Sequence, residues 1–260
     1  MAYTAVPESM KNIKALLYSV FGTIVDWRTT VAQELASFAT LTSTRCSINT
    51  QISSKNWHEF ARKWRSGCSD SVEKSLSTRH PFLTLDEIHR GVLATLIKEF
   101  EIPQHVWSED EMEQVNTVWH RLDCFEDGIP GLTRLSKKYI NATLSNANVK
   151  LLVDLKRHAG LHMLDYMFSA ELFKEYKPKD VTYLGACEML ALDPDEVVMV
   201  SSDQNDLVNA KKLGLRTVYV RRKDEVDYHR EVGGNEEPVG EDEFDWVVES
   251  LEELADVMGC

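Results

Sequence analysis

The stretch KALLYSVFGTIVDW, residues 14–27, contains an apolar run of strand length that leads into a glycine. The run covers residues 15–20, and Gly22 predicts a tight turn directly after it. A buried strand that ends in such a turn begins many sites that bind phosphates or carboxylates. Such a site would carry an acid at the end of the strand, and this chain has Ser19 there. The main functional question is therefore which chemistry a hydroxyl permits at this position.

Three further apolar runs of strand length follow, at residues 140–144 (INATL), 197–200 (VVMV) and 217–220 (TVYV). Runs that are apolar on both faces are typical of parallel strands covered by helices. Helical patterns lie between the runs, at residues 151–160, 181–192 and 206–215. Strands that alternate with helices predict an α/β fold with a doubly wound parallel sheet.

Residues 29–125 differ from the rest because they show almost no strand pattern. Four helical patterns follow one another there: TTVAQELASFAT, SKNWHEFARKWRSGCSDSVEKS, TLDEIHRGVLATLIKEF and SEDEMEQVNTVWHRL. They predict a helical bundle, inserted as a cap over the carboxyl edge of the sheet, where open α/β sheets bind ligands. We therefore expect a core domain of residues 1–28 and 126–260 and a cap domain of residues 29–125. Residues 223–245, rich in Glu, Asp and Gly, predict a solvated loop.

Composition restricts the class of protein. The 260 residues carry a net charge of −13 and 43% of them are hydrophobic, as in an ordinary globular protein. The acidic balance argues against nucleic acid or an anionic membrane surface as a partner. The cysteines are scattered without a CxxC pair, and the N-terminal residues lack a signal-peptide pattern. We expect a cytoplasmic protein that acts on a small molecule.

Polar residues stand at the ends of the predicted strands. Ser145 and Asn146 follow the second run, and SSDQNDL, residues 201–207, follows the third. Hydroxyl and amide groups at such positions are suited to bind an oxyanion. Lys177 precedes Pro178, which disfavours a helical conformation of the lysine. Each feature alone is a weak signal, but their order along the chain brings them to one edge of a parallel sheet.

Together these motifs resemble the haloacid dehalogenase superfamily, and specifically its 2-haloacid dehalogenase (type II) branch. The similar segments are YSVFGTIVDWR, WHEFARKWR, VWHRLDCFEDGIPGLTRL, TLSNANVKLL, SAELFKEYKPKDVTYL and VVMVSSDQNDLVNAKKLGLRTVYV. The resemblance covers nearly the whole chain. It implies a Rossmann-like α/β core with a helical cap and an enzyme that needs no metal and no other cofactor. Dimerisation is typical of relatives, so we also consider a homodimer.

The resemblance implies roles for individual residues. Ser19 stands where the family has its nucleophilic aspartate, and Lys177 matches the lysine that hydrogen-bonds that aspartate. Asp206 matches the acid that positions the hydrolytic water, and Asp203 stands where these dehalogenases often have asparagine. The implied substrate-binding residues are Arg65, which meets the substrate carboxylate or the leaving halide, and Ser145, Asn146, Ser201 and Tyr183. Phe21 is expected to face the same apolar cavity, and Trp64 belongs either to its wall or to the core of the bundle.

Two departures from the family bear on function. The chain lacks the DxD motif of the related phosphatases, because it reads Ser19-Val20-Phe21, and Ser202 occupies the position of their acidic magnesium ligand. Without those carboxylates we expect no metal site.

The second departure concerns the nucleophile. In the dehalogenases the aspartate displaces the halide and water then hydrolyses the ester. A neutral serine is a poor nucleophile without a base, so we expect ordinary dehalogenation to be absent or very slow.

Four functions remain open. In the preferred one, Asp203 acts as a general acid or base on an organic acid or carbonyl compound, in an elimination, isomerisation or cyclisation. Arg65, Ser145 and Asn146 hold the anionic group of that compound. In the second, Lys177 is the base for Ser19 in an acyl-transfer hydrolase, which the two nearby acids disfavour because they stabilise a charged lysine. In the third, the protein is a non-catalytic relative that binds a small anion. In the fourth, it is a 2-haloacid dehalogenase that carries an inactivating Asp-to-Ser change.

Overall fold

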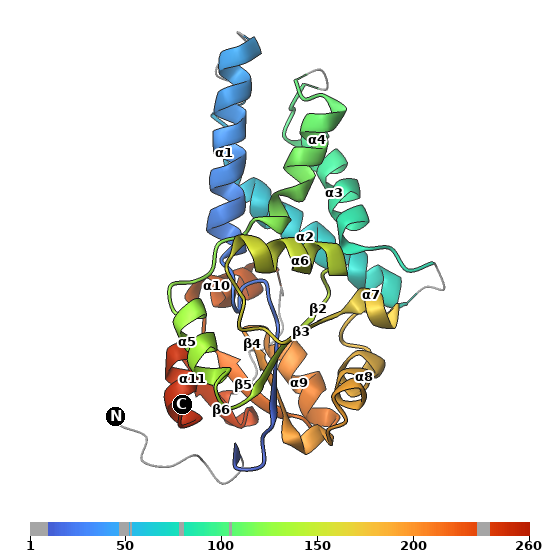
Figure 1. The fold of residues 1–260 in the computed structure, drawn as a ribbon. Coiled ribbons are helices and arrows are strands. Elements are labelled where there is room, and N and C mark those ends of the chain that lie inside the picture. The colour runs from blue at the N-terminus through green and yellow to red at the C-terminus, as the bar shows by residue number, and fades with distance from the viewer. Residues whose placement is uncertain (1–9, 47–51, 53, 78–80, 104–105, 233–239) are drawn as a thin grey trace.

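The computed structural model describes residues 10–46, 52, 54–77, 81–103, 106–232 and 240–260. Its centre is a six-stranded sheet with the strand order β3-β2-β1-β4-β5-β6, in which every neighbouring pair is parallel (Figure 1). The strands are β1 (Ala15–Tyr18), β2 (Ile140–Ser145), β3 (Tyr166–Ser169), β4 (Val197–Ser201), β5 (Arg216–Val220) and β6 (Trp246–Val248). The predicted doubly wound α/β fold is confirmed.

Helices cover both faces of the sheet. The core helices are α5 (Gly128–Leu135), α6 (Val149–His158), α7 (Ala170–Phe173), α8 (Asp180–Leu190), α9 (Gln204–Lys212), α10 (Lys223–Val232) and α11 (Leu251–Val257). Alternate residues of β1 point to opposite faces. Ala15 and Leu17 belong to a buried cluster with residues of α8 and α9, whereas Leu16 and Tyr18 belong to a second cluster with residues of α5, α6 and α11. The strand is therefore buried on both faces, which explains its uninterrupted apolar run.

The prediction of a solvated loop at residues 223–245 is wrong for its first part. Lys223–Val232 is the helix α10, and Glu241–Glu243 forms the 3-10 turn η4; residues 233–239 lie outside the described part. The helix packs against Trp27 through Glu225 and Tyr228, which stand one turn apart and are 5% and 3% exposed. The inward-facing residues of this helix include an acid, so a search for apolar periodicity missed it.

Two of the strands were also absent from the prediction, and both lie at an edge of the sheet. β3 has only two buried residues at its end, and β6 has three residues in total. A strand that is short or half exposed lacks the continuous apolar run that identifies a central strand.

The cap consists of α1 (Trp27–Cys46), α2 (Trp57–Leu76), α3 (Leu85–Glu99) and α4 (Glu109–Asn116), followed by the 3-10 turn η2 (Thr117–His120). All four predicted helical segments are helical, although the last one changes to 3-10 geometry after Asn116. Thr84 and Ser108 begin α3 and α4 with capping boxes, in which the cap hydroxyl and a glutamate three residues later bond each other's backbone N–H groups.

Two neighbouring chain segments connect the cap to the core. The N–H of Asp26 donates to the carbonyl of Asp123 at 2.9 Å, and the N–H of Phe125 donates to the carbonyl of Ile24 at 3.0 Å. The chain thus leaves the core and returns to it at one place, and the cap stands over the edge of the sheet at which β1 ends (Figure 1).

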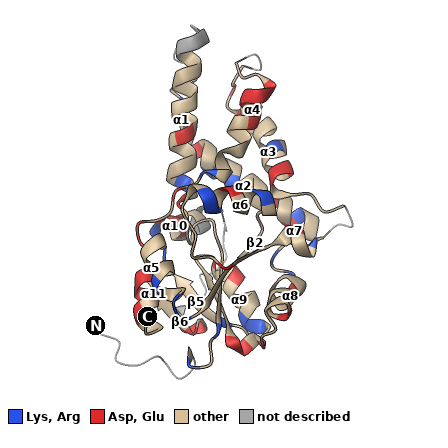
Figure 2. Cartoon of the chain, viewed as in Figure 1, with Lys and Arg blue, Asp and Glu red and all other residues tan. Residues whose placement is uncertain are grey.

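Charged residues of both signs are spread over the cap and the outer helices of the core (Figure 2). Among the described helices, none combines the length and the apolar character needed to span a membrane.

His120 of η2 connects the cap to the core. Its Nε2 lies 3.0 Å from Oδ1 of Asp86 on α3, and its Nδ1 lies 2.8 Å from Oδ2 of Asp154 on α6. Burial disfavours the imidazolium, but hydrogen bonds and charge attraction from both carboxylates outweigh burial, so the pKa of His120 is raised. The charged form of His120 therefore holds α3 of the cap against α6 of the core.

We predict that this bridge makes stability depend on pH. Because the folded-state pKa of His120 is raised, its contribution is complete below the ordinary histidine pKa and is lost as pH rises through the folded-state value. His120→Gln should lower the free energy of unfolding by about 1–3 kcal/mol at pH 5.5 and by less at pH 9. Urea unfolding at both pH values measures this difference. An equal loss at the two pH values would show that the charge on His120 is irrelevant.

Candidate active site

Three neighbouring strands end at the centre of this site. Ser19 follows β1, and its N–H donates to the carbonyl of Val200 in β4 at 2.9 Å. Ser145 is the last residue of β2, and Ser201 is the last residue of β4. Since β2 and β4 flank β1, both hydroxyls belong to strands that adjoin Ser19. The structure thus brings together the strand-end residues that the sequence predicted.

A buried ion pair joins two of the predicted catalytic residues. Nζ of Lys177 contacts Oδ2 of Asp206, with side chains 10% and 5% exposed. The hydroxyl of Tyr183 donates to Oδ1 of the same carboxylate at 2.6 Å. Oδ1 of Asn146 accepts the backbone N–H of Lys177 at 2.8 Å, which fixes the loop that carries the lysine. Burial and these contacts hold Lys177 and Asp206 as one rigid unit.

Asp203 has a structural role at the start of α9. Its Oδ1 accepts the backbone N–H groups of Asn205 at 2.9 Å and Asp206 at 3.4 Å. It therefore acts as the N-cap of the helix that carries Asp206. Ser201 supports this loop, because its Oγ accepts the N–H of Asp203 at 3.1 Å.

Ser145 makes a similar local contact after β2. Its Oγ accepts the backbone N–H of Ala147 at 3.1 Å. This bond uses a lone pair of the oxygen, and a serine hydroxyl can donate its own hydrogen as well.

Thr23 was not predicted from the sequence. Its Oγ1 accepts the backbone N–H of Ser202 at 2.9 Å and lies 3.0 Å from the hydroxyl of Ser202. Both side chains are buried, so they connect the turn after β1 to the loop after β4. Ser202, the position at which a magnesium-dependent relative has an acid, is thus bound to another hydroxyl. The described part of the chain contains no cluster of His, Cys, Asp and Glu that could hold a metal ion.

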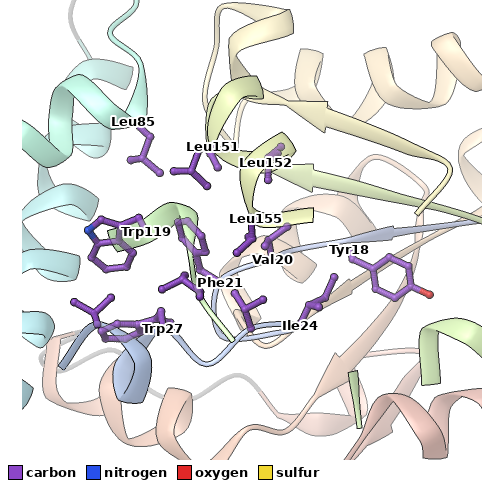
Figure 3. Packing of buried hydrophobic residues seen from close by; sticks show 14 of the residues in the cluster. Tyr18, Val20, Phe21, Ile24, Trp27, Leu85, Trp119, Leu151, Leu152 and Leu155 are labelled. Carbon is purple, nitrogen blue, oxygen red and sulfur yellow. The ribbon is translucent and has the colours of Figure 1, made fainter. Parts of the chain in front are cut away.

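Arg65 of α2 brings the cap to the turn after β1. Its guanidinium carbon lies 5.5 Å from the centre of the Phe21 ring, within the range of a cation–π contact. Phe21 in turn lies 5.6 Å from Trp119, which stacks at 6.1 Å on Trp27; Figure 3 shows these three rings together. Nε of Arg65 is buried and has no hydrogen-bond partner among the described residues.

Trp64 lies in the interior of the cap. It is fully buried, and its indole N–H donates to the carbonyl of His89 at 2.9 Å. Its ring meets Trp119 edge-on at 5.5 Å. These contacts give Trp64 a place in the bundle core, next in sequence to Arg65.

Glu225 of α10 is a second residue that sequence reasoning missed. The indole N–H of Trp27 donates to its Oε1 at 2.5 Å. Its carboxyl group lies against the backbone of Gly22, where a Cβ atom would be only 2.3 Å from Cδ of the glutamate. Gly22 also has a φ of +78°, which favours glycine. Burial raises the pKa of Glu225 to about 7, against the opposing influence of the Arg65 charge and the Trp27 hydrogen bond.

Comparison with known proteins identifies the family of the chain. The model of the haloacid dehalogenase-like hydrolase family matches residues 83–220. The protein belongs to this family of hydrolases, which confirms the family resemblance read from the sequence.

Two curated relatives are similar to part of the chain. It is 35% identical over 113 residues to (S)-2-haloacid dehalogenase 4A of Burkholderia cepacia, a match that covers 43% of this chain and 49% of that protein. It is 34% identical over 107 residues to (S)-2-haloacid dehalogenase 1 of Pseudomonas sp. (strain CBS-3), covering 40% of this chain and 47% of that protein. The matched segment thus spans about half the length of these relatives.

Solved structures are similar over almost the whole chain. The L-2-haloacid dehalogenase PA0810 has a TM-score of 0.81 and 30% identity, with 95% of this chain and 99% of that chain covered. The defluorinating L-2-haloacid dehalogenase Rha0230 has a TM-score of 0.83 and 29% identity, with both chains fully covered. The similarity includes the core and the cap.

We predict that the buried ion pair is important for stability. Asp206→Asn leaves the charge of Lys177 buried without its partner, which should lower the free energy of unfolding by about 3–5 kcal/mol. The double variant Lys177→Met/Asp206→Asn removes that charge and should be less destabilised than Asp206→Asn alone. Denaturant unfolding of both variants measures the difference.

The ion pair of Lys14 with Glu196 at the surface, with side chains 58% and 21% exposed, provides the control. Glu196→Gln should change stability little, because water screens charges at the surface. If Asp206→Asn were no more destabilising than Glu196→Gln, the buried pair would have no special role.

Proposed function

We propose that the protein is a 2-haloacid dehalogenase-type hydrolase whose site accepts small 2-substituted carboxylic acids, and that Ser19 blocks the ester route of halide release. The main support is the unit of Lys177, Asp206 and Tyr183, whose acid lies on the helix that follows β4, the strand next to β1. In the family an aspartate at the position of Ser19 forms the ester, and the acid at the position of Asp206 positions water. This chain retains the second group without the first.

Two sets of groups are suited to hold the carboxylate of such a substrate. Arg65 supplies a positive charge beside the Phe21 ring, and its buried Nε has no partner among the described residues. Ser145 and Asn146 contribute hydroxyl and amide donors at the end of β2. A carboxylate bound by an arginine and neutral donors gains charge-assisted hydrogen bonds. The aromatic rings around Phe21 suit the apolar part of a small acid better than a sugar phosphate.

The covalent product formed at position 19 explains why a serine there blocks the ester route. A carboxylate that displaces halide from C2 forms an ester, and water cleaves the ester by attack at its carbonyl carbon. A serine oxygen that displaces the same halide releases its proton and forms an ether. The ether has no carbonyl carbon for water to attack, so the enzyme would stop after one turnover. Ser19 therefore cannot replace an aspartate in this cycle, even with a base to activate it.

Two of the other hypotheses receive less support from the geometry. A Ser19–Lys177 dyad needs a neutral lysine, whereas the ion pair with Asp206 uses its ammonium form. General acid–base chemistry by Asp203 must compete with the capping role of that carboxylate. The proposal that this scaffold is redirected to elimination, isomerisation or cyclisation thus has no specific support, and dehalogenase-type chemistry is preferred.

We predict that Ser19→Asp opens the ester route. Chloride release from L-2-chloropropionate should rise at least ~100-fold over the unaltered chain, because a carboxylate nucleophile then faces the substrate. Ser19→Asn, which matches aspartate in size but has no charge, should remain inactive. Chloride titration measures all three proteins. Rapid chloride release by the unaltered chain, with no gain from Ser19→Asp, would refute the proposal.

Asp203→Asn tests the general acid–base alternative directly. Asparagine is as good an N-cap as aspartate, so the variant removes the charge and keeps the helix start. In the Ser19→Asp background, we expect this variant to keep its chloride release within about tenfold, because proton transfer by a catalytic group typically contributes ~100-fold or more. A loss of more than ~100-fold would assign the essential acid or base to Asp203.

A further inference from the structure

The start of α3 contacts the core through Tyr176, which lies between α7 and α8. The hydroxyl of Tyr176 donates to the carbonyl of Leu83, shortly before the helix begins, at 2.6 Å. The ring of Tyr176 is 2% exposed and stacks on Phe82 at 4.9 Å. Figure 1 shows α7 on the opposite side of the molecule from α1, where the chain enters the cap. Tyr176 thus joins cap and core far from their covalent connection.

Asn148 supplies a second contact to the same part of the cap. It stands at the N-cap position of α6, yet its side chain accepts no backbone N–H of this fully described helix. Its Oδ1 instead accepts the N–H of Asp86 at 3.3 Å, and its Nδ2 donates to Oδ2 of Asp86 at 2.8 Å. The N–H groups of a helix's first turn have no partner within the helix. A core residue therefore satisfies the first turn of a cap helix.

Apolar side chains close the space between these two contacts. Leu85, in the first turn of α3, is 2% exposed and belongs to the same buried cluster as Leu151 and Leu152 of α6 (Figure 3). Separation of cap and core would expose these side chains to water, which is unfavourable. The hydrogen bonds of Tyr176 and Asn148 are therefore expected to form and break together.

Both contacts are carried by loops that also carry residues of the candidate site. Tyr176 directly precedes Lys177, and Asn148 lies two residues after Asn146. The loops are bonded to each other, because Oδ1 of Asn146 accepts the backbone N–H of Lys177 at 2.8 Å. In each loop one residue contacts the cap and a close neighbour belongs to the site. The position of the cap thus bears on the backbone of both loops.

We propose that residues 82–86 form a clasp between cap and core, and that Tyr176 is a positioning residue that couples the closed clasp to the place of Lys177. Asp206 holds Nζ of this lysine from the core, and the clasp holds its backbone from the side of the cap. Opening of the cap breaks the bonds of Tyr176 and Asn148, so the loop of Lys177 loses a support. The role in the reaction rests on the proposed function, whereas the clasp itself does not.

Amide hydrogen exchange tests the clasp, because exchange of a protected N–H reports how often the structure around it opens. Tyr176→Phe keeps the ring that stacks on Phe82 and removes the hydroxyl. Exchange should rise about two- to tenfold, the effect of one lost hydrogen bond, in the peptides that cover residues 82–88 and 174–179. The factor should be the same in both peptides, since one opening event releases both.

Tyr139→Phe is the matched control. The hydroxyl of Tyr139 donates to the carbonyl of Met258 at 3.0 Å, so this variant also removes one tyrosine–carbonyl bond, but inside the core. It should leave exchange in residues 82–88 and 174–179 unchanged. An equal rise in the control and in Tyr176→Phe would show a general loss of stability and would contradict the clasp.

Asn148→Ala tests the coupling from a residue that lies in neither peptide. It removes both bonds to Asp86 and no N-cap bond of α6, so exchange should rise by one factor in both peptides. A rise in residues 82–88 alone would show that the start of α3 opens without moving the loop of Lys177. A rise in residues 174–179 alone would assign the effect to Asn146. Either result would overturn the inference, and this variant decides the matter if Tyr176→Phe does not fold.

Propionate, a substrate-like anion without a leaving group, separates this inference from the proposed function. If the site binds a small carboxylate with the clasp closed, propionate should slow exchange in residues 82–88, which are not among the groups proposed to hold it. Bound propionate that leaves this exchange unchanged would refute the coupling of clasp and site. If the unaltered protein does not bind propionate, the proposed carboxylate site fails, and the two variants still decide whether the clasp moves Lys177.

Discussion

The buried ion pair of Lys177 with Asp206 is the interaction on which the site depends. It joins the loop after α7 to the first turn of α9, and Tyr183 of α8 adds a hydrogen bond to the same carboxylate. Neither charge is stable in the protein interior without the other. The pair therefore fixes three separate segments at the carboxyl edge of the sheet. Arg65 and the aromatic rings approach this edge from the cap.

Ser19 limits what this arrangement can do. β1 is hydrogen-bonded on both sides, so the residue that follows it has a fixed place at the centre of the edge. In the proposed function, the reaction cycle needs a group there that can form an ester and be released from it. A hydroxyl would form an ether, which has no carbonyl carbon for water to attack. We therefore propose that the site binds a small acid while the ester route is closed.

Much of this could be predicted from the sequence, and the reasons for the failures are physical. Apolar runs identified the central strands because those strands are buried on both faces. The order of polar residues after those runs predicted that Ser19, Ser145 and Asp206 would meet at one edge. β3 and β6 were missed because edge strands have few buried residues. Glu225 was missed because a buried acid on a helix face resembles a solvated residue in sequence, and its partner Trp27 is 198 residues away. Likewise, the role of Asp203 as a helix cap was not anticipated.

The central proposal is that the site binds a 2-haloacid with its reactive carbon facing position 19 but does not convert it. A crystal structure of the unaltered protein soaked with L-2-chloropropionate tests this most directly. We expect the intact ligand, with its carboxylate at Arg65 or at the donors after β2 and its C2 atom next to the hydroxyl of Ser19. A ligand bound away from Ser19, or the hydroxy acid product in the site, would contradict the account.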